Sequence, residues 1–200
     1  MRDLLLIRHG ETPWSRSGRH TSYSEQELTP EGEDEARSLR PVLAGRDVAA
    51  TFVSPRKRAL RTADLAGFED YTVDPDLAEW DYGGYEGITT DEIHRERPDW
   101  FLFTDGVAPG GPDHPGEQPA DVGARADRVL ARLEPLLAQE DGEGDVAVVA
   151  HGHFLRVLTA RRLGLPPSAG ALFTFHTGVV GLIGTEHGRP ALLAWNARSI

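Results

Sequence analysis

Short apolar runs recur along the chain and predict the strands of a sheet. Most have the length of a buried strand, and charged residues, glycine or proline flank them. The predicted strands are Asp3 to Ile7, Asp47 to Val53, Tyr71 to Val73, Asp145 to Ala150, Val179 to Ile183 and Ala191 to Trp195. Runs such as Asp145 to Ala150, with hardly a polar position, are typical of strands that are covered on both faces.

Segments with helical spacing lie between these runs. A capping hydroxyl, a proline and an acid at Thr29-Pro30-Glu31 predict the start of a helix, and Ala36, Leu39 and Leu43 follow at helical intervals. Further helices are predicted from Ser54 to Ala66, from Asp121 to Gln139 and from Phe154 to Leu163. Pro135 is expected to kink the third of these or to end it early.

The middle of the chain breaks this alternation. Gly83 to Gly116 is rich in Gly, Pro and Asp, and we expect it to be irregular apart from one helix around Thr90 to Arg97. Elsewhere strands alternate with helices, which predicts a three-layer α/β/α sandwich with a mainly parallel central sheet. We expect residues 1–200 to form a single domain with an irregular substrate-side insertion around 83–120.

Composition narrows the classes of function. The chain has 200 residues and a formal charge of −11, so nucleic acid and anionic membranes are disfavoured as partners. It contains no cysteine, which excludes disulfide scaffolds, Cys-ligated zinc and cysteine nucleophiles. Leu4 to Ile7 is too short for a signal peptide or a membrane helix, so we expect a cytoplasmic protein.

Basic side chains follow several predicted strands at the point where each strand ends. Arg8 and His9 follow the first strand, Ser54 and Arg58 follow the second, and His151 follows the strand Asp145 to Ala150. Ligands of open α/β sheets bind outside the carboxyl ends of the strands. The sequence therefore predicts a cationic site at this edge of the sheet, inside a protein that is acidic overall.

Histidine and arginine at such an edge point to phosphoryl transfer. A neutral imidazole can attack phosphorus and carry the phosphoryl group, and the guanidinium fork binds phosphate oxygens in pairs. A carboxyl group must still protonate the departing alcohol oxygen. Glu79 is the candidate acid because it precedes a turn-rich stretch that could bend over the site, and Asp81 and Glu11 are the alternatives.

Four motifs make a resemblance specific. Four segments resemble, in chain order, the motifs of the histidine phosphatase superfamily, the phosphoglycerate-mutase-like proteins. They are Arg8-His9-Gly10-Glu11-Thr12, Ser54 to Ala63, Leu77-Ala78-Glu79 followed by Tyr85-Glu86-Gly87, and Val149 to Gly152. The resemblance implies the phosphoglycerate-mutase-like fold. Four further segments look most like the sugar-bisphosphatase branch of this family, which includes the fungal sedoheptulose-1,7-bisphosphatase. They are Trp14 to Ser15, Gly18 to Thr21, Tyr82 to Gly87 and His151 to Arg156.

The resemblance also assigns roles. It implies His9 as the nucleophile and Glu79 as the acid and base, with Arg8, Arg58 and His151 holding the phosphoryl group. It implies substrate contacts at the positions Ser15, Thr21, Ser22, Tyr82 and Gly152. Ser22 replaces a glycine that is common there. The expected activity is hydrolysis of a phosphate monoester of a small metabolite, such as a sugar phosphate or bisphosphate, without cofactor or metal.

Several alternatives remain open at this stage. The protein could be a phosphoglycerate mutase or a non-catalytic phosphate-binding module, although an end at Ile200, soon after the last strand, favours an open site and hydrolysis. His151 and His153 could form a metal pair, but no third ligand accompanies them at a convincing spacing. His20 could line the pocket or lie in solvent, and Trp14, Trp80, Trp100 and Phe101 could form a substrate wall or pack under a loop. The oligomeric state is not predicted.

Overall fold

The computed structural model describes residues 2–139, 143–198 and 200. At its centre lies a six-stranded sheet with the order β3-β2-β4-β1-β5-β6. The strands are β1 (Leu4–Arg8), β2 (Val48–Val53), β3 (Thr72–Val73), β4 (Asp145–Ala150), β5 (Val180–Glu186) and β6 (Arg189–Ala197). The pairs β3–β2, β2–β4 and β4–β1 are parallel, whereas β5 pairs antiparallel with both β1 and β6. The predicted, mainly parallel sheet is confirmed.

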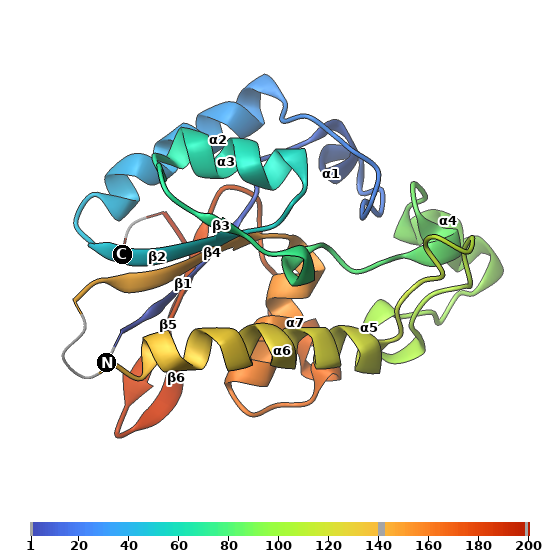
Figure 1. Ribbon diagram of the computed structural model, residues 1–200. Coiled ribbons are helices and arrows are strands. Elements are labelled where there is room, and N and C mark those ends of the chain that lie inside the picture. Colours follow the sequence, from blue (N-terminus) through green and yellow to red (C-terminus); the bar gives the residue numbers. More distant parts are fainter. Residues whose placement is uncertain (1, 140–142, 199) are drawn as a thin grey trace.

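Helices cover both faces of this sheet, which gives the predicted three layers (Figure 1). Helices α2 (Pro30–Leu43) and α3 (Lys57–Ala66) pack on one face, and α6 (Pro119–Leu137) and α7 (Gly152–Arg162) pack on the other. The side chains of β1 alternate between the two cores: Leu4 and Leu6 face α6 and α7, and Leu5 and Ile7 face the opposite layer. Continuous apolar runs in the sequence reflect this burial on both sides.

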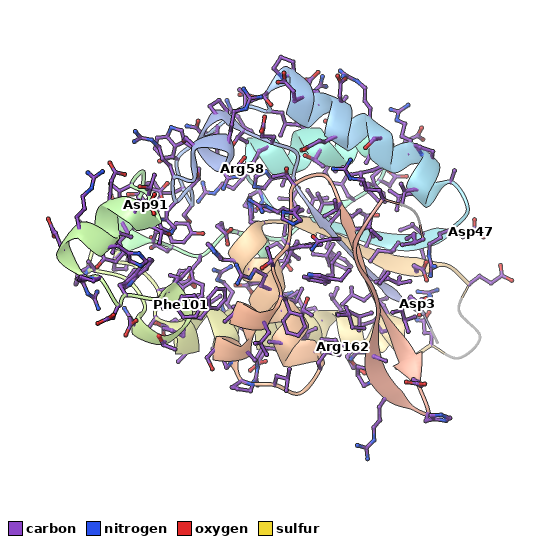
Figure 2. The ribbon with its side chains drawn as sticks, turned by 180° about the vertical axis from the view of Figure 1, so that it is seen from behind. Asp3, Asp47, Arg58, Asp91, Phe101 and Arg162 are labelled. Atoms are coloured by element: carbon purple, nitrogen blue, oxygen red, sulfur yellow. The ribbon has the colours of Figure 1, made fainter. Side chains whose placement is uncertain are left out.

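The remaining elements are short helices and 3₁₀ turns, and those of the 83–120 segment lie at one end of the molecule (Figure 1). The full set comprises the short helices α1 (Pro13–Ser17), α4 (Thr90–Glu96) and α5 (Leu102–Asp105) and the 3₁₀ turns η1 (Pro75–Leu77), η2 (Gly83–Tyr85) and η3 (Pro167–Leu172). Figure 2 shows Asp91 and Phe101 at this end, far from Asp3 and Asp47 at the other end of the sheet. The helix expected around Thr90 to Arg97 is α4, and the region from residue 83 to residue 120 also holds α5 and η2, which were not predicted.

Several element boundaries differ from those that the sequence predicted. Helix α3 begins at Lys57 and not at Ser54, because Arg56 is still extended. Helix α6 continues past Pro135 and ends at Leu137, short of the predicted Gln139. Helix α1 was not predicted; it forms because Thr12 and Ser15 cap each other reciprocally and Pro13 occupies the first turn.

Candidate active site

Three adjacent strands deliver the predicted site residues to one edge of the sheet. Strand β4 lies between β2 and β1, so the segments that follow these strands begin side by side. The N–H of His9 donates to the carbonyl of Ala150 (3.1 Å), and the N–H of Ser54 donates to the carbonyl of Val149 (3.0 Å). The sheet thus brings Arg8, His9, Ser54 and His151 together, and Arg58 joins them from the first turn of α3.

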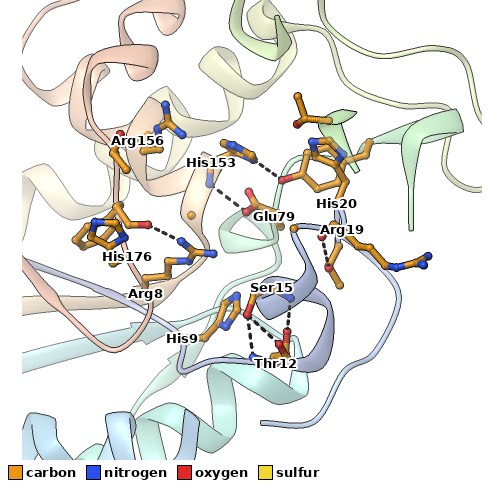
Figure 3. A pocket seen from close by; sticks show the side chains of 17 residues that line it. Arg8, His9, Thr12, Ser15, Arg19, His20, Glu79, His153, Arg156 and His176 are labelled. Carbon is orange, nitrogen blue, oxygen red and sulfur yellow. Dashed lines mark hydrogen bonds between the residues drawn. The ribbon is translucent and has the colours of Figure 1, made fainter. Parts of the chain in front are cut away.

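A cavity of about 240 Å³ opens at this edge (Figure 3). The predicted residues that line it are Arg8, His9, Ser15, Thr21, Glu79, Tyr82 and Gly152. Its other lining residues are Thr12, Gly18, Arg19, His20, Thr90, His153, Arg156, Thr174, Phe175 and His176. Glu79 is the only acidic residue in these two sets, so the cavity is strongly cationic although the protein carries a net charge of −11.

His9 is held in a single tautomer. Its Nδ1 lies 2.8 Å from the carbonyl oxygen of Gly10. Because that oxygen can only accept, Nδ1 carries the proton and Nε2 keeps its lone pair. Burial, helped by the charges of Arg58 and Arg8, holds the pKa of His9 well below its ordinary value of 6.5. The imidazole is therefore neutral, which is the nucleophilic form.

Arg58 and His151 lie behind His9 and do not line the cavity. The Nε of Arg58 donates to Nδ1 of His151 (3.2 Å), so Nε2 of His151 carries the proton and donates to the hydroxyl of Ser54 (2.6 Å). The rings of His9 and His151 meet edge to face at 5.1 Å. Both ring nitrogens of His151 are thus engaged by protein groups, and its ring packs against the ring of His9.

Arg8 and Gly152 contact each other in the cavity wall. A Cβ on residue 152 would lie 3.1 Å from both Cζ and Nε of Arg8, so only glycine allows this approach without displacement. One Nη of Arg8 donates to the carbonyl of Phe175. Its Nε is buried and has no hydrogen-bond partner within the described part of the chain. A buried donor without a partner next to a cavity is suited to an anionic ligand.

The carboxylate of Glu79 is held at the start of α7. Its Oε1 accepts from the backbone N–H groups of Trp80 (2.8 Å) and Phe154 (2.8 Å), and its Oε2 accepts from the N–H of His153 (3.0 Å). The alternative acids have other partners: Asp81 accepts from the N–H groups of Gly83 and Gly116, and Glu11 pairs with Arg16 and Thr29. Glu79 is therefore the acidic side chain that the cavity presents.

The buried Tyr82 and His20 and the partly buried His153 form an aromatic group in the cavity wall. The Tyr82 hydroxyl lies 2.6 Å from Nδ1 of His153, and the His20 ring lies 4.7 Å from the Tyr82 ring. Burial raises the pKa of Tyr82 well above 10, so its hydroxyl keeps its proton and donates to His153. His20 lines the cavity and is not a solvated loop residue, because its Nδ1 is held by the carbonyl of Ile88 (2.9 Å).

The predicted substrate contact at Ser22 is not supported by the geometry. Ser22 is buried, and its N–H donates to the carboxylate of Glu86 (2.9 Å) instead of facing the cavity. Its neighbour Thr21 does line the cavity. The Ser15 hydroxyl accepts from the N–H of Thr12 (2.9 Å) and also borders the cavity, so it combines the capping role with the predicted location.

Of the two alternatives for the tryptophans, a substrate wall or packing under a loop, the structure shows packing for Trp80 and Trp100. Trp80 and Trp100 are buried in the core under the 83–120 segment, and their indole N–H groups donate to backbone carbonyls. The aromatic residues that line the cavity are Tyr82 and Phe175. Packing under a long segment is the common fate of tryptophan, and a lone sequence cannot distinguish it from a ligand wall.

Three arginines on the cavity wall share an unusual environment. Arg8, Arg19 and Arg156 donate to the carbonyls of Phe175, Gly87, and Gly170 and Ala171, respectively. Over the described residues, none of the three forms an ion pair with a carboxylate, whereas arginines elsewhere on the surface do so repeatedly. Their charges are thus held in place by neutral groups and remain available to a ligand. Sequence reasoning missed Arg19 and Arg156 because arginine is so frequent in this chain.

Neither a metal-binding cluster nor a membrane-spanning helix is found in the described part of the chain. Among residues 2–139, 143–198 and 200, no group of three or more His, Asp or Glu side chains is arranged to hold a metal ion. Within the same residues, no helix combines the length and the apolar character needed to cross a membrane.

A neutral histidine, a cationic cavity and a carboxylate lie together at the carboxyl ends of parallel strands, an arrangement that is suited to phosphoryl transfer. Residues 4–198 match the histidine phosphatase superfamily (branch 1), and the chain belongs to this family. The predicted family is confirmed, including the relationship to sugar bisphosphatases.

Individual relatives agree with this assignment. The chain is 42% identical to the acid phosphatase of Mycobacterium tuberculosis over 92% of its own length and 87% of that protein. It is 35% identical to sedoheptulose 1,7-bisphosphatase of Saccharomyces cerevisiae, with coverage of 80% and 67%. Among solved structures, the product of an open reading frame of Mycobacterium tuberculosis superposes with a TM-score of 0.87 at 40% identity, covering 98% and 97% of the two chains. Phosphoglycerate mutases are among the more distant relatives.

Proposed function

We propose that the protein hydrolyses phosphate monoesters of small anionic metabolites through a phosphohistidine on His9. The observation that carries this proposal is the state of His9: Nδ1 is bound to the Gly10 carbonyl, and the unprotonated Nε2 belongs to a ring that lines a cavity with Arg8 and Glu79. A neutral imidazole fixed in one tautomer needs no deprotonation before attack.

The first step forms the bond between Nε2 of His9 and phosphorus while the bond from phosphorus to the ester oxygen breaks. The departing oxygen takes a proton from the carboxyl group of Glu79. Arg8 stabilises the charge that develops on the phosphoryl oxygens, since its buried Nε has a free hydrogen. Arg58 and His151 do not line the cavity; they hold the His9 region in place, and Arg58 adds positive charge.

The second step returns the enzyme to its starting state. A water molecule attacks phosphorus, its proton passes to the Glu79 carboxylate, and the bond to Nε2 breaks to release inorganic phosphate. The backbone N–H groups at the start of α7 keep the carboxylate fixed through both steps. The chemistry uses side chains alone, so we expect activity to persist when metal ions are removed.

The substrate that this cavity favours carries a second anionic group. Arg8 accounts for the transferred phosphoryl group, and Arg156 and Arg19 are two further cations without a carboxylate partner within the described residues. A second phosphate or a carboxylate would neutralise one of them. The relative from Saccharomyces cerevisiae is named for a sugar that carries two phosphates. We therefore propose sugar bisphosphates or phosphorylated sugar acids as substrates and expect a cytoplasmic location.

Phosphate release from p-nitrophenyl phosphate in the presence of EDTA tests the proposed chemistry. A panel of phosphorylated sugars and glycolytic acids then ranks substrates by kcat/KM. The hydrolase assignment is lost if no ester releases phosphate. Isomerisation of 3-phosphoglycerate faster than hydrolysis of any ester would instead identify a mutase, which remains the second candidate because mutases are relatives.

A further inference from the structure

Arg125 of α6 lies outside the cavity, and its guanidinium is buried; the residue is 7% exposed. An arginine is rarely buried without partners. Arg125 forms a two-bond ion pair with Glu117: Nε lies 2.8 Å from Oε1, and Nη2 lies 2.6 Å from Oε2. The sequence does not single out Arg125. It belongs to none of the four motifs, and α6 also contains Arg128 and Arg132.

The same guanidinium binds the backbone that leads to Glu79. Its Nη1 donates to the carbonyls of Asp76 and Ala78, and its Nη2 donates to the carbonyl of Glu79 itself (3.2 Å). Residues 76–79 lie in the 3₁₀ turn η1 and in the extended chain after it, outside the longer helices and the sheet. Arg125 therefore ties this segment to the rigid α6.

Glu117, the partner of Arg125, binds the chain on the other side of Glu79. Its Oε2 accepts from the N–H of Asp81 (2.9 Å), and its backbone carbonyl accepts from the indole N–H of Trp80 (2.8 Å). The Arg125–Glu117 pair thus holds the backbone both before and after Glu79, and it links this backbone to α6 and to the 83–120 segment.

A further contact connects Arg125 to the group that holds the Glu79 carboxylate. The guanidinium lies over the ring of Phe154, with Cζ 4.6 Å from the ring centre. The N–H of Phe154 donates to Oε1 of Glu79. Arg125 therefore contacts the main chain that carries the acid and also the residue that orients its carboxylate.

We infer that Arg125, through its ion pair with Glu117, is a positioning residue for Glu79. This inference rests on the proposed function, in which Glu79 protonates the leaving group. A displacement of the acid of about 1 Å can reduce a rate by roughly 100-fold. Lysine at position 125 would keep the charge but not the planar fork that makes these bonds at once.

The test compares two esters, because only the protonation of a poor leaving group depends on the acid. We would measure kcat/KM for p-nitrophenyl phosphate and for glycerol 2-phosphate; this ratio reports the steps up to departure of the alcohol. Arg125→Lys should lower the value for glycerol 2-phosphate by about tenfold or more, and should lower the value for p-nitrophenyl phosphate by less than about threefold.

A double-mutant cycle separates positioning from general loss of structure. In the Glu79→Gln background the acid is already absent, so Arg125→Lys should change the hydrolysis of glycerol 2-phosphate by less than about twofold. The matched control is Arg128→Lys, on the same helix, where an exposed arginine pairs with the carboxylate of Asp76 (2.9 Å). This control should leave both esters unaffected.

Thermal unfolding of each variant shows whether it is folded, since removal of one partner from a buried ion pair is strongly destabilising. Glu117→Gln is the second variant: it keeps the charge of Arg125 and its bonds to the backbone, and should reproduce the selective loss more weakly. Equal losses on both esters, or additive losses in the double variant, would refute the positioning role of Arg125 but not the proposed function. Absence of hydrolysis of either ester by the wild-type protein would refute the proposed function as well.

Discussion

Arg8 packs against the backbone of Gly152 so closely that a Cβ at position 152 would lie 3.1 Å from its Cζ. Gly152→Ala should therefore displace the Arg8 guanidinium and lower kcat/KM for p-nitrophenyl phosphate by about tenfold. The fold should persist, because residue 152 is the first residue of α7 and tolerates alanine there. Gly45→Ala is the control, since no atom lies within 4 Å of the added Cβ. Equal activity of the two variants would argue against this contact.

His9→Ala should abolish turnover while the protein remains folded. Loss of the nucleophile removes the phosphohistidine route, and we expect the rate with p-nitrophenyl phosphate to fall by more than about 1,000-fold. Circular dichroism checks the fold. His187→Asn is the control: His187 is exposed in the turn between β5 and β6 and has a positive φ of 49°, which asparagine tolerates. Activity of His9→Ala near the wild-type rate would remove His9 from the mechanism.

Glu79→Gln should slow poor leaving groups more than good ones. Glutamine keeps the shape of the side chain but cannot donate the proton that an alcohol oxygen needs, so the loss should be about 100-fold or more with glycerol 2-phosphate. With p-nitrophenyl phosphate the loss should be several times smaller, because the phenolate departs without a proton. The measurement is kcat/KM for both esters, and a uniform loss would show that Glu79 is not the general acid.

The stability of the fold should depend on pH through the buried histidines. Burial lowers the pKa of His9, His20, His151 and His153 below 6.5 in the folded protein. Below pH 6.5 the unfolded chain then binds more protons than the folded one, so the free energy of unfolding falls as the pH drops below that value. Each histidine contributes up to about 1.4 kcal/mol per pH unit.

Urea unfolding over a pH series measures this dependence. His153→Asn should make the slope below pH 6.5 shallower, because one buried imidazole is removed, and an exposed-site variant such as His187→Asn should keep the wild-type slope. A free energy of unfolding that stays constant from about pH 6.5 down to about pH 5 would contradict the burial of these rings as neutral groups.

The sequence allowed the sheet and the residues at its edge to be predicted, because apolar runs and the residues after them are local signals. His9 and His151 follow β1 and β4 as expected, and Arg8 is the last residue of β1. The finer contacts were not predictable: Ser22 turns toward Glu86, and Arg58 binds His151 and the carbonyls of the 21–24 turn. Such contacts join residues that are far apart in the chain. The sequence alone does not show which of its many polar side chains will meet.

Helix α1 and the boundaries around Pro135 show a second limit. Pro135 lies in the last turn of α6, so the backbone hydrogen bond that it removes is close to the end of the helix, and the helix ends two residues later. Thr12 and Ser15 cap a short helix through reciprocal bonds, although five residues would not form a stable helix alone. In both places, the boundary depends on the capping and backbone bonds of a few residues, which the apolar pattern of the sequence does not reveal.

Within the described residues, the arginines of the cavity donate hydrogen bonds to carbonyl oxygens and form no ion pair, which suggests that inorganic phosphate is itself a ligand of the cavity. The product of each turnover has the same charge and the same oxygen geometry as the group that Arg8 would receive from a substrate. We therefore expect product inhibition: phosphate should compete with the ester, and the hydrolytic rate should respond to the concentration of free phosphate in the surroundings. Because the cavity presents its cations to the substrate, it also presents them to the inorganic phosphate that the reaction releases.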